Sequence, residues 1–156
     1  SDNIILDKYT PLSIDKINSI FKSNQSIILV TDKIDNLNLL ISSFNFPERM
    51  IVEVFSIAKY NEAIKLGINN IALNININHL GVNSWLKLNK IKAVTYRGDD
   101  LYKKGKALTN AIELSELRIV SLIYSVADIN PRFLEEDLEI KNFAVYSNFI
   151  TPLNYD

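Results

Sequence analysis

The sequence predicts an α/β protein with a parallel sheet, and two observations carry this prediction. Short runs rich in β-branched residues alternate with amphipathic stretches along the whole chain. In most of these runs apolar residues occupy both odd and even positions, which is typical of parallel strands covered on both faces. Periodicity alone leaves two architectures open: an open doubly wound sheet, or part of a closed barrel.

Six strands and six helices are predicted in alternation, with a helix first and a strand last. The predicted strands are Ile27–Asp32, Met50–Ser56, Asn70–Ile75, Lys92–Tyr96, Arg118–Val126 and Phe143–Phe149. The predicted helices are Pro11–Lys22, Asp35–Phe44, Ile57–Leu66, Val82–Leu88, Leu108–Leu117 and Pro131–Leu138. Gly67 follows the third helix directly, where a left-handed residue commonly ends a helix. We expect one domain over residues 1–156, with right-handed crossovers.

Composition excludes several classes of function. A net charge of −1 argues against a broad nucleic-acid surface, and with no cysteine there is no disulfide framework, thiolate zinc site or cysteine nucleophile. No run approaches the roughly 20 apolar residues that span a bilayer, and no signal-peptide pattern is present. We therefore expect a cytoplasmic protein with no membrane span.

One acidic residue lies at the carboxyl end of a predicted strand, where barrel enzymes place their chemistry, and a second lies inside a strand. Asp32 ends an apolar run and would suit a hard cation such as Mg²⁺ or Ca²⁺; the alternative is a cap for the helix that follows. Glu53 lies inside a strand. It is either a polar residue of the core or a ligand that faces the mouth of the barrel.

Basic residues follow the fourth strand. Arg97 could hold a phosphate oxygen, whereas the alternative is a surface ion pair with Asp99 or Asp100. Lys103 belongs to a small basic cluster on the same loop, which is either a phosphate-binding or a solvated feature. Arg97 and Lys103 are the predicted substrate-binding residues, and the partner they predict is a phosphodiester or phosphorylated small molecule.

Two further residues carry less specific expectations. His79 is the only histidine and lies in an Asn-rich loop, with no carboxylate or second ligand nearby in the sequence. A polar loop residue is the simpler interpretation, with catalysis as the alternative. Trp85 is spaced three residues from Leu88, and we expect it to pack in the core.

Four segments resemble, in order, those of bacterial glycerophosphodiester phosphodiesterase-like proteins. The segment TPLSIDKINSIFKSNQSIILVTDK resembles the helix that leads into the third barrel strand, and IVEVFSIAKYNEAIKLGINNIALNI the next strand, helix, glycine turn and strand. IVSLIYSVAD resembles the strand that ends in Thr-Val-Asn, and FAVYSNFITP the terminal strand that ends in Thr-Asp. The resemblance covers nearly the whole chain. It implies a partial (βα)8 barrel of about six parallel strands, without the first two.

The chain departs from that family at its catalytic positions. The family's opening His-Arg-Gly strand, its Glu-x-Asp strand and its second histidine have no counterpart here. Asp32 matches a metal-binding carboxylate, but Ile34 stands where the family has a lysine, unless Lys33 takes its place. Thr-Val-Asn becomes Ser125-Val126-Ala127, and Thr-Asp becomes Ser147-Asn148.

Two functions follow from this comparison. The first is a degenerate, non-catalytic domain with a binding or scaffolding role, which as given holds no cofactor. The second is part of an active metal-dependent phosphodiester hydrolase, whose catalytic histidines lie in a missing N-terminal segment and which uses Mg²⁺ or Ca²⁺ when intact. A barrel that lacks two strands also leaves open edges at Ile27–Asp32 and Phe143–Phe149, which predicts either self-association or pairing with the missing part of the same polypeptide.

Overall fold

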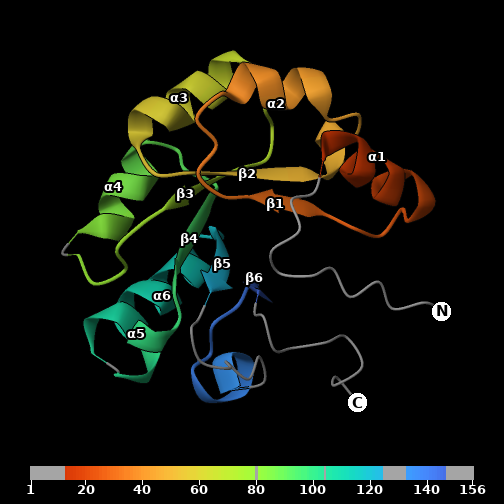
Figure 1. The fold of residues 1–156 in the computed structure, drawn as a ribbon. Coiled ribbons are helices and arrows are strands. Elements are labelled where there is room, and N and C mark those ends of the chain that lie inside the picture. The colour runs from red at the N-terminus through yellow and green to blue at the C-terminus, as the bar shows by residue number, and fades with distance from the viewer. Residues whose placement is uncertain (1–12, 80, 104, 125–132, 147–156) are drawn as a thin grey trace.

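The computed structural model describes residues 13–79, 81–103, 105–124 and 133–146, and these contain one curled sheet of six parallel strands (Figure 1). The strands are β1 (Leu29–Thr31), β2 (Met50–Val54), β3 (Ile71–Asn74), β4 (Ala93–Arg97), β5 (Val120–Tyr124) and β6 (Phe143–Tyr146). Each strand pairs with the next one along the chain. A doubly wound sheet would reverse its strand order at a switch point, so the sequential order confirms the half-barrel alternative.

Helices connect the strands and lie on the outside of the curl (Figure 1). They are α1 (Ile14–Ser23), α2 (Leu37–Ser43), α3 (Ile57–Lys65), α4 (Val82–Leu88), α5 (Asp99–Tyr102) and α6 (Lys106–Glu116), with single turns η1 (Pro47–Arg49) and η2 (Phe133–Asp137). The short helix α5 was not predicted. No helix in the described part of the chain is long and apolar enough to cross a bilayer.

Local sequence explains where several helices begin and end. Ser13, Asn36 and Ser56 cap α1, α2 and α3, because each side chain accepts a hydrogen bond from a backbone amide three residues later. Gly67 adopts a left-handed φ of 77° just after α3, and its amide donates to the carbonyl of Ile64. The predicted role of Gly67 is therefore confirmed.

The two faces of the sheet differ in character. Val52 and Val54 of β2 point outward into a core that the helices cover, together with Tyr96 of β4 and Leu86 of α4. Because side chains alternate along a strand, Glu53 points to the opposite, inner face. The register also brings the carboxyl ends of neighbouring strands to one edge, since Val54 lies opposite Leu73.

Candidate functional site

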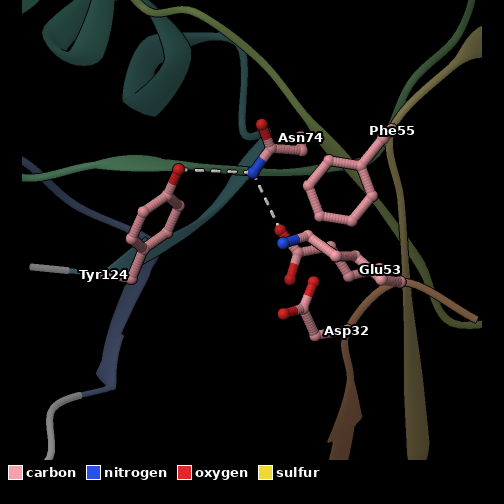
Figure 2. A pocket seen from close by; sticks show the side chains of 6 residues that line it. Asp32, Glu53, Phe55, Asn74 and Tyr124 are labelled. Carbon is pink, nitrogen blue, oxygen red and sulfur yellow. Dashed lines mark hydrogen bonds between the residues drawn. The ribbon is translucent and has the colours of Figure 1, made fainter.

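A hydrogen-bonded network crosses four strands on the inner face, near their carboxyl ends, and Figure 2 shows its members Glu53, Asn74 and Tyr124. Asn74 of β3 donates from Nδ2 to Glu53 Oε1 on β2 at 2.9 Å and to Thr95 Oγ1 on β4 at 3.1 Å. A longer contact of 3.5 Å joins the same Nδ2 to the hydroxyl of Tyr124 on β5. The Thr95 hydroxyl donates in turn to Glu53 Oε1 at 2.5 Å. These bonds fix the orientation of one carboxylate.

Glu53 is the centre of this network, and it is only 6% exposed. Its Oε1 accepts two hydrogen bonds, one from the fully buried Thr95 and one from Asn74. Its Oε2 accepts none from the residues that the structure describes, and Glu53 lines a cavity. Glu53 is therefore a polar residue of the core that also lines the cavity, and its role as a ligand stays a prediction.

The cavity beside Glu53 has a volume of about 230 Å³. We call it the acidic cavity, and its lining residues are Asp32, Lys33, Glu53, Phe55, Asn74 and Tyr124. Figure 2 shows the carboxylate of Asp32 lying beside Glu53, with the Phe55 ring on the adjacent wall. Two carboxylates and one ammonium group leave this lining with a net negative charge.

Asp32 thus reaches the mouth, as predicted, while its alternative role as a helix cap is wrong. The cap of α2 is Asn36, whose side chain accepts a hydrogen bond from the Leu39 amide at 2.9 Å. Asp32 lies four residues before that cap and lines the acidic cavity instead. The turn there is tight, because Lys33 adopts a left-handed φ of 49°.

As a metal centre, the acidic cavity offers an incomplete set of ligands. Ca²⁺ takes six to eight oxygen ligands, and Mg²⁺ takes six in an octahedron. Asp32 and Glu53 supply carboxylates, but within the described ranges no three acidic, histidine or cysteine residues are placed so that together they could hold a metal ion. Asn74 directs its amide nitrogen into the network, so this group donates hydrogen bonds and does not ligate. Water or a ligand would have to complete the coordination shell.

The predicted substrate-binding residues are not among the residues that line the acidic cavity, although Arg97 lies opposite Tyr124, which does line it. Arg97 ends β4 and pairs with Asp99, with Nη2 and Oδ2 2.7 Å apart. This hydrogen bond and the charge of Asp99 raise the pKa of Arg97 above its usual value. Lys103 follows α5 and pairs with Asp100 at 3.1 Å. The ion-pair alternative for Arg97 is confirmed, and phosphate binding by Arg97 or Lys103 stays a prediction.

His79 and Trp85 line a second cavity that adjoins the first. The prediction that Trp85 packs in the core is wrong, since it is 41% exposed and Leu88 is 81% exposed. Helix α4 instead buries Val82 and Leu86, so Trp85 falls on the side of the helix that faces this cavity. His79 is exposed at the rim.

Sequence reasoning named Asp32 and Glu53 but missed Asn74, Thr95 and Tyr124. Asn74 and Tyr124 share one signal, because they are polar residues at the last position of β3 and β5, whereas Thr95 lies two residues before the end of β4. The substituted family positions Ser125–Ala127 and Ser147-Asn148 lie outside the described residues.

Comparison with family models, curated proteins and solved structures found no match to this chain. The likeness to glycerophosphodiester phosphodiesterases therefore rests on the four sequence segments alone. What the chain can bind has to be argued from the two carboxylates and their surroundings.

Proposed function

We propose that this chain is a non-catalytic binding domain on a partial barrel, and that the acidic cavity is its ligand site. One observation carries the proposal: Glu53 is almost fully buried, yet its Oε2 is left free to face the cavity beside Asp32. A buried carboxylate is costly unless it is paired with a cation or fully hydrogen-bonded. A cationic group in the cavity would satisfy both Oε2 and Asp32.

A non-catalytic role is supported by the distribution of acid–base groups. Phosphodiester cleavage of the kind that the resemblance implies uses histidines, and the chain has only His79. His79 lines the neighbouring cavity, and within the part of the chain that the structure covers no histidine lines the acidic one. We expect no hydrolysis of glycerophosphodiesters or bis-(p-nitrophenyl) phosphate with Mg²⁺, Ca²⁺ or Mn²⁺ above the metal-only control.

Binding is tested by calorimetry with two kinds of cation, Mn²⁺ and a simple alkylamine. Asp32→Asn and Glu53→Gln keep the shape of the cavity and remove one charge each, so each variant should weaken cation binding. Asp137→Asn is the matched control, because Asp137 is an exposed aspartate at the end of η2. Unchanged binding in both cavity variants, or no cation binding by the native chain, would contradict the proposal.

A second candidate function is part of an active metal-dependent phosphodiester hydrolase. The placement of Asp32 and Glu53 at the carboxyl ends of adjacent strands favours it, because barrel active sites lie at this end. Under this interpretation Asp32 is a surviving ligand for Mg²⁺ or Ca²⁺, and the catalytic histidines come from a segment that this chain does not contain. An upstream His-Arg-Gly strand followed by Glu-x-Asp in the gene would favour the hydrolase over the binding domain.

A further inference from the structure

A larger cavity of about 420 Å³ lies next to the acidic cavity, at the same end of the strands. We call it the aromatic cavity, because Phe55 and Trp85 line it and are 47% and 41% exposed. Further apolar surface comes from Ile57 of α3 and Val82 of α4. This volume lies within the range of roughly 300–1,000 Å³ that is typical of small-molecule sites.

The two cavities share part of their walls. Phe55 and Asn74 line both. Phe55 follows β2 directly and lies two residues from Glu53, so it separates the carboxylates on one side from Trp85 on the other. A single ligand can therefore reach from one cavity into the other past the Phe55 ring.

We propose that one ligand occupies both cavities, and that it is a small organic cation with an apolar, ring-bearing body. Its ammonium group would lie between Asp32 and Glu53, and its body would pack against Phe55 and Trp85. This inference rests on the proposed function, and it adds the chemical class of the ligand.

The acidic cavity suits an ammonium group better than a bare metal ion. A primary ammonium has three N–H donors, and the free Oε2 of Glu53 and the carboxylate of Asp32 offer acceptors for them. The adjacent Phe55 ring adds a cation–π contact, which a ligand cation gains over an aromatic face. A divalent metal ion would need several more oxygen ligands, whereas the positive charge of Lys33 opposes a metal ion and an ammonium group alike.

The aromatic cavity suits an apolar body for a separate reason. Two large aromatic side chains that remain nearly half exposed present apolar area that a ligand can remove from water. Polar groups at the rim, among them Asn76 and His79, would orient such a body. An anionic body is disfavoured, because both carboxylates would repel it.

The test compares three probes on the full chain by calorimetry: phenethylamine, ethylamine and phenylacetate. Phenethylamine carries both an ammonium group and a phenyl ring. Ethylamine carries only the ammonium group, and phenylacetate carries the ring with a negative charge. Trp85 is the only tryptophan, so its fluorescence should also report ring binding directly. We expect phenethylamine to bind about tenfold or more tightly than either other probe, since burial of a phenyl ring exceeds 1.4 kcal/mol, which is tenfold in affinity.

Two variants locate the body of the ligand. Trp85→Ala should weaken phenethylamine binding about tenfold and leave ethylamine unchanged. Leu88→Ala is the matched control, because Leu88 is on the same helix, is 81% exposed and lies outside the cavity. A loss of phenethylamine affinity in Asp32→Asn would show that the ammonium group lies beside Asp32.

The outcomes separate this inference from the proposed function. Equal binding of ethylamine and phenethylamine, or no effect of Trp85→Ala, would overturn the inference and leave the cation site intact. Binding of Mn²⁺ without binding of any amine would also overturn it, in favour of a metal ligand. If neither metal nor amine binds, both proposals fail.

Discussion

The Thr95 hydroxyl holds the buried carboxylate of Glu53, and Thr95→Val removes it with little change in shape. Thr95 is fully buried, and its Oγ1 donates to Glu53 Oε1 at 2.5 Å. A hydrogen bond to a charged group contributes about 1.5–3 kcal/mol to stability. Asn74 still donates to Oε1 at 2.9 Å in the variant, so the carboxylate keeps one partner. We expect Thr95→Val to lower the free energy of unfolding by about 2 kcal/mol.

Urea unfolding followed by far-ultraviolet circular dichroism measures this loss, with an unchanged m-value as the sign that only stability has changed. Thr95→Ser is the control for packing, because it keeps the hydroxyl and loses one methyl group, which costs about 1 kcal/mol. Repeating Thr95→Val in a Glu53→Leu background completes a double-mutant cycle. With the carboxylate gone, the substitution should cost much less, because it then removes only the acceptor for the amide of the half-buried Asn74. An equal loss in both backgrounds, or a loss below about 0.5 kcal/mol in the native chain, would refute the reasoning.

Three further predictions concern other parts of the fold. Burial raises the pKa of Tyr96 from 10.0 to about 12, and Ser121 offsets part of this rise. Because Tyr96 in the unfolded chain ionises at a lower pH than in the folded chain, the stability that it contributes is present below pH 10 and falls between pH 10 and 12. The whole loss is about 2–3 kcal/mol. In Tyr96→Phe the free energy of unfolding, measured by urea unfolding at a series of pH values, should not fall in this way between pH 10 and 12. An equal fall in the native chain and in the variant would contradict the shift. Arg118 has a left-handed φ of 57° just after α6, at the position that Gly67 occupies just after α3. Arg118→Gly should therefore raise the unfolding free energy by about 0.5–1 kcal/mol, and Gly67→Ala should lower it. Changes of the same sign in both variants would show that these turns are not equivalent. Among the described residues β1 and β6 each pair on one side only, and Ile28 and Val30 at the first edge are 60% and 38% exposed. These edges predict self-association in sedimentation at micromolar concentration, and a monodisperse monomer would disprove it.

The positions of the strands could be predicted from the sequence because each strand overlaps a β-branched run. Their order could not be predicted from these runs, which left a doubly wound sheet open, and was implied only by the resemblance to the barrel family. The ends were harder to place: Ile27–Asp32 was predicted, and the strand is Leu29–Thr31. At the edge of a sheet a strand has one neighbour, so fewer ladder hydrogen bonds extend it. Local sequence does not record how many neighbours a strand has.

The orientation of a short helix could not be predicted in the same way. Helix α4 has seven residues, about two turns, and apolar residues lie on more than one of its faces. It buries Val82 and Leu86, and it also buries Asn83, which donates to the carbonyl of Asn110 at 2.9 Å. That polar contact cannot be read from the sequence. It lies on the buried face of α4, and Trp85 is left on a more exposed face.

The partners of Glu53 could not be predicted, because polar residues in a strand look alike whether they meet water or each other. Asn74 and Thr95 are 21 residues apart and belong to different strands. Parallel register places them opposite each other, and Figure 2 shows the Tyr124 hydroxyl directed toward Asn74. Contacts of this kind depend on the curled geometry of the inner face.

Glu53 raises a question about stability that connects the fold with the proposed ligand. Replacement of buried ionic groups by apolar residues of similar size is often neutral or stabilising, by about 1–4 kcal/mol. A residue kept only for packing at this position would be better as leucine. We therefore expect the double variant Glu53→Leu, Thr95→Val to equal or exceed the native chain in stability while it loses cation binding. If that variant is instead less stable by several kcal/mol, the carboxylate serves the fold, and the strongest reason for a cation site in this cavity is removed.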